Sequence, residues 1–156
     1  MRERFETFTV LISEISRYIY RIKAEEMAEL ELRGSHVNIL YYLYKMESLT
    51  AKELSDVCGE DKANISRAVK HLEENGYLTG ADESGHKRYQ TLLMLTEKGR
   101  ETGKIIADKV DRVLEHASAG LTESDRDTMY RSLRLISGNL KEICRMYGAD
   151  KEDKTE

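Results

Sequence analysis

The segment of residues 50–78 carries the start and stop signals of two short helices separated by a tight turn. Thr50 and Glu53 have the spacing of a capping box, in which a hydroxyl and a carboxylate each satisfy a free backbone N–H group. Gly59 can adopt the left-handed conformation that ends a helix. Asp61 is a suitable N-cap for a second helix, which an Asn-Gly pair would end. The spacing therefore predicts a helix, a turn and a second helix.

The second predicted helix has one apolar face and one polar face. Its apolar residues recur at steps of three and four, as a helix requires: Ile65, Ala68, Val69 and Leu72. The opposite face carries cations, an amide, a hydroxyl and a small side chain: Lys62, Ala63, Asn64, Ser66, Arg67 and Lys70. Arg67 suits a guanine edge and Asn64 suits adenine. Because the second helix of a helix-turn-helix enters the major groove, we predict that this face binds DNA. The alternative is an ordinary solvated helix face.

A polar segment at residues 81–87 separates two β-prone runs, residues 77–80 and 88–95. This pattern predicts a β-hairpin with an exposed tip, or wing. Lys87 and Arg88 stand where the tip returns to the sheet, so we expect them to reach phosphates or the minor groove. The alternative is a polar turn with two solubilising cations.

Taken in order, these elements resemble the multiple-antibiotic-resistance regulator (MarR) family of winged-helix transcription factors. The resemblance rests on the two capped helices, the wing and the Leu-Thr-x-x-Gly sequence at residues 95–99. It implies DNA contacts through the polar residues of the second helix and its N-cap, Asp61. The family usually has Asp-x-Arg or Asp-Arg-Arg in the returning wing strand. This chain has Lys87-Arg88-Tyr89 there, so Arg88 matches the arginine of the family pattern and no residue matches its aspartate.

The segments on either side are strongly helical in pattern, and the 156-residue chain contains no proline. Apolar residues recur at steps of three and four along residues 5–22, 106–117 and 129–147. A terminal helix with this much apolar edge indicates packing against a second subunit, and the alternative is that it covers its own domain. We expect the first helix to continue to about Leu32.

We predict a mainly α fold with a small two-stranded β wing, in which a winged helix-turn-helix is flanked by long helices. Residues 1–33 and 97–147 form the predicted dimerisation region, and residues 34–96 form the predicted DNA-binding region. Residues 148–156 are charged and aperiodic, so we expect a disordered tail. No apolar run approaches the roughly 20 residues that cross a bilayer, and the N-terminus lacks a signal-peptide pattern, which favours a cytoplasmic protein.

Other kinds of site receive little support from the sequence. The formal net charge of −4 argues against a general polyanion binder, although a dimer can still present a local cationic edge. The four histidines are scattered, the two cysteines have no CxxC spacing, and no catalytic motif is present. We therefore expect no metal, no cofactor and no enzymatic activity. Cys58 falls on an inner helix stripe, which favours a core role over a redox role.

The resemblance also implies that a small effector binds in a crevice beside the DNA-binding region. His36, Tyr41 and Tyr44 are the candidates, because tyrosine offers an apolar face and a hydroxyl, and the alternative is that the tyrosines only pack. The leading hypothesis is a homodimeric repressor that binds a pseudo-palindromic site on double-stranded DNA and is released by a small molecule. An alternative is a winged-helix protein adaptor that does not bind DNA. A third is a metal- or thiol-dependent sensor.

Overall fold

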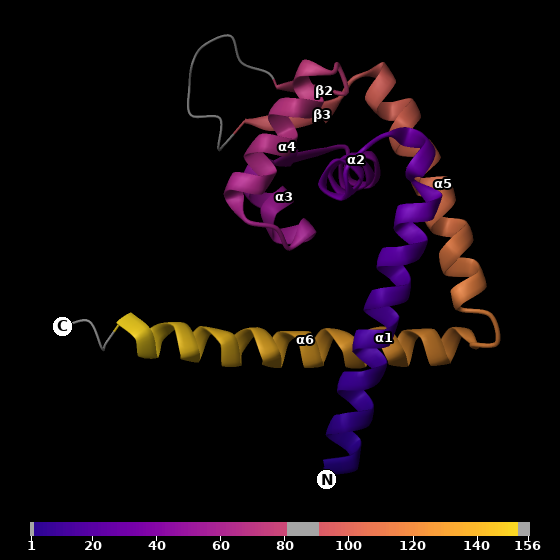
Figure 1. Cartoon of the computed structure of the whole chain (residues 1–156), viewed down its shortest axis with the longest axis vertical. Helices are drawn as coiled ribbons and strands as arrows, with labels where there is room; N and C mark the ends of the chain where they lie inside the picture. The colour runs from indigo at the N-terminus through magenta and orange to yellow at the C-terminus, as the bar shows by residue number, and fades with distance from the viewer. Residues whose placement is uncertain (1, 81–90, 153–156) are drawn as a thin grey trace. The chain divides into compact units, whose positions relative to one another are not determined.

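The computed structural model describes residues 2–80 and 91–152, with side chains for residues 7–79 and 91–147 (Figure 1). The elements in chain order are α1 (Arg2–Glu26), η1 (Ala28–Leu30), α2 (Gly34–Met46), β1 (Ser48–Thr50), α3 (Ala51–Cys58), α4 (Lys62–Glu74), β2 (Leu78–Gly80), β3 (Leu92–Leu95), α5 (Glu97–Ala117) and α6 (Glu123–Glu152). This mainly helical fold with a small antiparallel sheet confirms the predicted class. The chain divides into two compact units, Met1–Arg112 and Val113–Glu156, and the helix-turn-helix lies wholly in the first.

The helix-turn-helix begins and ends where the sequence predicts. The Thr50 hydroxyl accepts a hydrogen bond from the Glu53 N–H at 3.2 Å, and the Glu53 carboxylate accepts one from the Thr50 N–H at 2.7 Å. Gly59 ends α3 with a φ of 66°, in the left-handed region that glycine adopts without strain. Asp61 Oδ1 accepts from the Asn64 N–H at 2.8 Å and caps α4. Local capping chemistry therefore fixes the bounds of both helices.

The core of the first unit forms around α2. Ile39, Leu40 and Leu43 of this helix are almost completely buried. They lie with Leu54 of α3 and Ile65 of α4 in one apolar cluster, and Figure 1 shows α3 and α4 beside α2. The burial of these side chains from water fixes which face of α4 points inward.

The small sheet has three antiparallel strands in the order β1-β3-β2, where the sequence predicted only the two strands of the wing. In β3, Leu93 and Leu95 are buried and the alternate residues are exposed, as the period of a strand requires. Leu93 pairs with Leu49 of β1, so the added strand joins the segment before α3 to the base of the hairpin. Residues 81–90, which include Lys87 and Arg88, lie outside the described residues.

The Leu-Thr-x-x-Gly sequence joins the start of α5 to the end of α4. Thr96 Oγ1 donates to the Gly76 carbonyl at 2.7 Å and accepts from the Gly99 N–H at 3.0 Å. The Thr96 N–H donates to the Tyr77 carbonyl at 3.0 Å. A Cβ atom added at Gly99 would lie 2.0 Å from that same carbonyl oxygen, closer than any contact that real Cβ atoms make. Only glycine therefore allows α5 to approach the turn after α4 this closely.

Two helix ends differ from the sequence prediction. The first helix ends at Glu26 rather than near Leu32, because the chain turns so that Met27 is buried in the core and Leu30 packs beside it. The last helix continues to Glu152 and therefore includes residues 148–152, for which we predicted a disordered tail. Gly148 costs only about 1 kcal/mol in a helix, and neither a proline nor a cap follows it to end the helix there.

None of the helices in the described part of the chain combines the length and the apolar character that spanning a membrane requires.

We predict that Gly99→Ala lowers the free energy of unfolding by about 2–3 kcal/mol, because the new methyl group must displace the Tyr77 backbone. Gly34→Ala is the matched control: Gly34 also lies in the first turn of a helix, and an added Cβ meets nothing within 4 Å. Urea unfolding followed by circular dichroism measures both variants. Equal stabilities for the two would contradict the close approach.

Candidate nucleic-acid interface

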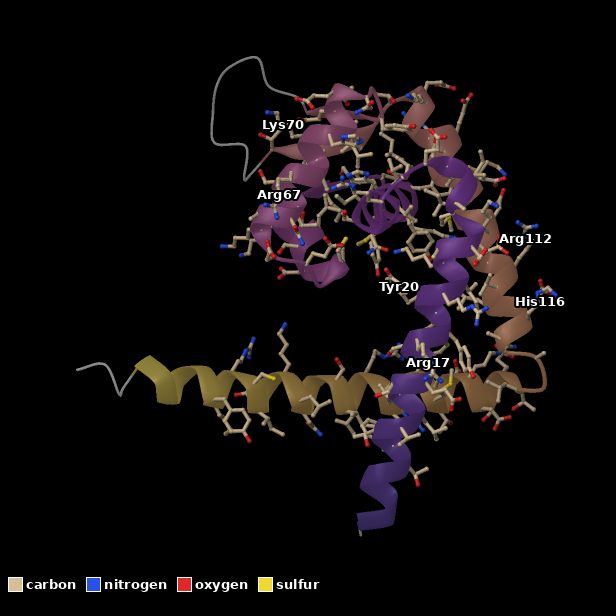
Figure 2. The ribbon with its side chains drawn as sticks, viewed as in Figure 1. Arg17, Tyr20, Arg67, Lys70, Arg112 and His116 are labelled. Atoms are coloured by element: carbon tan, nitrogen blue, oxygen red, sulfur yellow. The ribbon has the colours of Figure 1, made fainter. Side chains whose placement is uncertain are left out.

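The outer face of α4 consists of the polar side chains that the sequence singled out. All of them are exposed: Lys62, Ala63, Asn64, Ser66, Arg67 and Lys70. The apolar residues of the same helix, such as Ile65 and Leu72, are buried. Figure 2 shows Arg67 and Lys70 on the side of α4 that points away from α2. The helix therefore presents cations, an amide and a hydroxyl to its surroundings, while their assignment to DNA contacts stays a prediction.

Arg67 and Asn64 form a hydrogen-bonded pair at the start of this face. The Nη2 group of Arg67 donates to Asn64 Oδ1 at 2.6 Å. The backbone N–H of Asn64 in turn donates to the Asp61 carboxylate that caps the helix. Residues three apart on a helix lie on the same face, so this pairing needs no distortion. The guanidinium group is thus tied to the first turn of α4.

Charge is distributed unevenly along α4. Lys62 and Arg67 lie in the first two turns, where the positive end of the helix dipole also lies. The acids of the helix, Glu73 and Glu74, lie in the last turn, and Glu74 forms an ion pair with Lys70 at 3.8 Å. Apart from the Asp61 carboxylate that caps the helix, the charged side chains in the first two turns of α4 are therefore cations. A helix that meets DNA with its N-terminal residues would present this part to it.

His36 is a buried residue that packs against the inner side of α4. It is buried, and its ring stacks on that of His71 from α4 with the ring centres 4.4 Å apart and the planes 8° from parallel. Its Nδ1 atom accepts a hydrogen bond from the Arg33 N–H at 3.4 Å. Burial, the neighbouring His71 and the positive charge of Arg33 lower the pKa of His36. The lowered pKa favours the neutral form of His36. In this form the ring packs α2 against α4.

A pocket of about 470 Å³ lies between the end of α1 and the start of α2. Apolar and polar side chains line it together, and they come from α1, η1, α2 and the α3–α4 turn: Tyr20, Lys23, Ala24, Met27, Ala28, Leu32, Ser35, Val37, Asn38 and Glu60. The ammonium group of Lys23 donates to the Asn38 side chain and to the Gly34 carbonyl. Burial lowers the pKa of Lys23, against the opposing effect of Glu60.

None of the three effector candidates from the sequence lines this pocket. Tyr41 is half-buried and meets the ring of Tyr42 edge to face, and Tyr44 packs where α5 crosses α2 at Gly103. Sequence reasoning missed the pocket because Tyr20 and Lys23 belong to a helix whose apolar pattern indicated only subunit packing. No local motif marks a space that forms between two elements.

Cys58 is half-buried beside the core. Burial, with the nearby Glu60, raises the pKa of its thiol to about 11, so the thiol stays protonated at neutral pH. A protonated thiol is a poor nucleophile, which favours the core role over a redox role. Within residues 7–79 and 91–147, no three His, Cys, Asp or Glu side chains gather as a metal site would need.

Comparison with known proteins identifies the family. A sequence model of the MarR family matches residues 30–88, which run from the end of η1 through α2, β1, α3, α4 and β2 into residues 81–88. Residues 30–88 thus match the MarR family, in the part of the chain that contains the helix-turn-helix. The structure also contains the paired strands β2 and β3 and the Leu-Thr-x-x-Gly junction at residues 95–99, on which the resemblance rests.

Curated relatives and solved structures resemble most of the chain. The uncharacterised HTH-type transcriptional regulator YybA of Bacillus subtilis is 23% identical over 130 residues, which is 83% of this chain and 86% of YybA. A putative MarR family transcriptional regulator from Listeria monocytogenes, solved in complex with 26mer DNA, is 26% identical with a TM-score of 0.74 over 84% of this chain and 87% of its own. Staphylococcus aureus MarR, solved with salicylate and kanamycin, is 20% identical with a TM-score of 0.74 over 89% and 93%. The likeness to these proteins covers more than four fifths of this chain in each case.

The neutral, buried His36 makes stability depend on pH. Because its pKa lies below the ordinary value of about 6.5, the unfolded chain binds a proton more readily than the folded chain does. We predict that the free energy of unfolding decreases as pH falls from about 7.5 to about 5. His36→Phe, which keeps a flat ring, should flatten this dependence, whereas the exposed His116→Gln should not. Urea unfolding at several pH values measures the slopes, and equal slopes for His36→Phe and the unmodified protein would contradict the assignment.

Proposed function

We propose that the protein is a homodimeric repressor that binds a pseudo-palindromic DNA site and reads it through α4 in the major groove. The observation that carries this proposal is the exposed polar face of α4, with Lys62 and Arg67 in its first two turns, beside the Asp61 cap, and Glu73 and Glu74 in its last. Cations and amides on an exposed helix are the groups that contact phosphates and base edges. The Listeria relative in complex with DNA supports the same conclusion.

Two long helices that leave large apolar side chains exposed support the proposed homodimer. On α1 these residues are Val10, Leu11, Ile12, Ile15, Tyr18, Ile19, Tyr20 and Ile22. On α6 they are Met129, Tyr130, Leu133, Leu135, Leu140, Ile143, Met146 and Tyr147. A soluble monomer rarely exposes apolar surface on this scale, so we infer that these helices pack against a second copy. Two copies would hold their α4 helices about 34 Å apart, one turn of DNA.

Release by a small molecule is the second part of the proposal. The pocket between α1 and α2 has the volume and the mixed lining of a small-molecule site. It joins a helix of the inferred dimer to the scaffold helix behind α4, so a ligand there could change how the two α4 helices are held. The salicylate complex of the Staphylococcus aureus protein supports this idea. Because the proposed target is genomic DNA, the protein would act in the cytoplasm.

We predict that Arg67→Ala weakens binding to a duplex from the protein's own promoter region by about 1–3 kcal/mol and relaxes its sequence preference. The physical reason is the loss of a guanidinium group from the face that would meet base edges. The measurement is a mobility-shift titration at a fixed, physiological salt concentration, because salt alone changes such affinities strongly.

Lys104→Ala is the control that matches the change in charge. Lys104 is exposed on α5 and pairs with Asp108, outside the α4 face. It should leave specific binding almost unchanged. Equal losses from both variants would mean that Arg67 contributes only general charge. No duplex binding by the unmodified protein would refute the DNA-binding proposal and favour a protein adaptor.

The dimer has a separate test. Ile19→Glu on α1 and Leu133→Glu on α6 each place a carboxylate on an apolar face that we assign to the interface, where its burial is costly. We predict that each converts the protein from twice the 18.0 kDa chain mass to a monomer in light scattering coupled to gel filtration. Met46→Glu is the control, because Met46 is a comparably exposed apolar residue at the end of α2. A monomeric unmodified protein would refute the homodimer.

A further inference from the structure

We propose that Asn64 is a positioning residue that directs Arg67 toward guanine, and that Asn64 does not itself read adenine. This inference rests on the proposed DNA binding and deepens it, because it states which base the operator must present to α4. The sequence alone suggested separate roles for the two side chains. Their hydrogen bond in the structure couples these roles.

The first step is the geometry of the pair. Asn64 Oδ1 accepts from Arg67 Nη2 at 2.6 Å, and the donor is a charged group. Asn64 is itself held in the first turn, because its N–H donates to the capping carboxylate of Asp61 at 2.8 Å. Arginine has several rotatable bonds, so a partner fixed to the helix backbone restricts where the guanidinium group points. The restriction exists before any DNA arrives, which lowers the entropy lost on binding.

The second step is the supply of donors and acceptors. Asparagine reads adenine by accepting from N6 and donating to N7, so it needs its carbonyl oxygen. In Asn64 one of the two lone pairs of that oxygen already accepts from Arg67, and the guanidinium group beside it offers only donors. The combined surface is therefore rich in donors. Guanine presents two acceptors in the major groove, O6 and N7, whereas adenine presents an amino group that would face other donors.

The third step compares the partners of Lys70 and Arg67, because a charged partner offsets the charge of a cation and a neutral partner does not. Lys70 pairs with the carboxylate of Glu74, which offsets its charge. Arg67 pairs with a neutral amide, so its position is fixed while its positive charge remains available. An acidic partner would also have fixed the guanidinium group, but it would have repelled phosphates. The neutral partner makes Arg67 suited to an electron-rich base edge next to the DNA backbone.

The test uses the full-length protein and the duplex that it enriches from a randomised pool. Each guanine of that duplex is replaced in turn by 7-deazaguanine, which lacks the N7 acceptor. We expect one guanine in each half-site at which this replacement lowers affinity about tenfold. The loss should be nearly absent in Arg67→Ala. It should be clearly smaller in Asn64→Ala, which removes the partner but leaves the arginine.

Asn64→Asp separates positioning from a merely structural role. Its carboxylate can still accept from Arg67, so the sensitivity to 7-deazaguanine should return, although overall affinity falls because the new charge repels phosphates. Ser66→Ala, an exposed neighbour on the same helix, should keep the full sensitivity. Circular dichroism checks that each variant is folded.

Two outcomes overturn the inference while leaving the proposed function intact. In the first, the protein binds its duplex, but Asn64→Ala keeps the full tenfold loss. In the second, an adenine rather than a guanine is required, and Asn64→Ala removes that requirement. If no duplex is enriched at physiological salt, the proposed function itself fails.

Discussion

The burial of one face of α4 against α2 is the constraint from which the rest of the first unit follows. With Ile65 and Leu72 almost fully removed from water, rotation of α4 about its axis would expose apolar surface at a cost of several kcal/mol. The opposite face must then point outward, whatever its residues are. The chain places there the cations and polar groups that suit nucleic acid. Packing thus sets the orientation, and the identity of the outer residues sets the chemistry.

Much of this arrangement could be predicted from local sequence, because its causes are local. A capping box, a left-handed glycine and an aspartate N-cap each act within four residues, and the structure contains all three. The apolar period of α4 likewise gives its buried face without knowledge of the partner helix. The Asn64–Arg67 bond also spans only three residues. This bond could therefore have been predicted from the sequence. We instead predicted that Arg67 and Asn64 contact different bases.

Features that depend on distant residues could not be predicted in this way. Strand β1 has only three residues, and its partners in β3 follow more than forty residues later, so no periodic signal marks it. The end of α1 is set by the burial of Met27 and not by a stop signal. The pocket beside Lys23 exists only because α1 and α2 meet. In each case the decisive neighbour is far away in the sequence.

The junction at Thr96 and Gly99 has a mechanical consequence. The first turn of α5 is tied to Gly76 and Tyr77 by hydrogen bonds and by a contact that leaves no room for a side chain. Gly76 and Tyr77 follow the C-cap of α4, so the start of α5 is joined to the turn that ends α4. A force that tilts α5 would reach this turn through the Thr96 hydroxyl and through backbone atoms, and not through long, flexible side chains. A change in the tilt of α5 would therefore also change the position of the exposed face of α4.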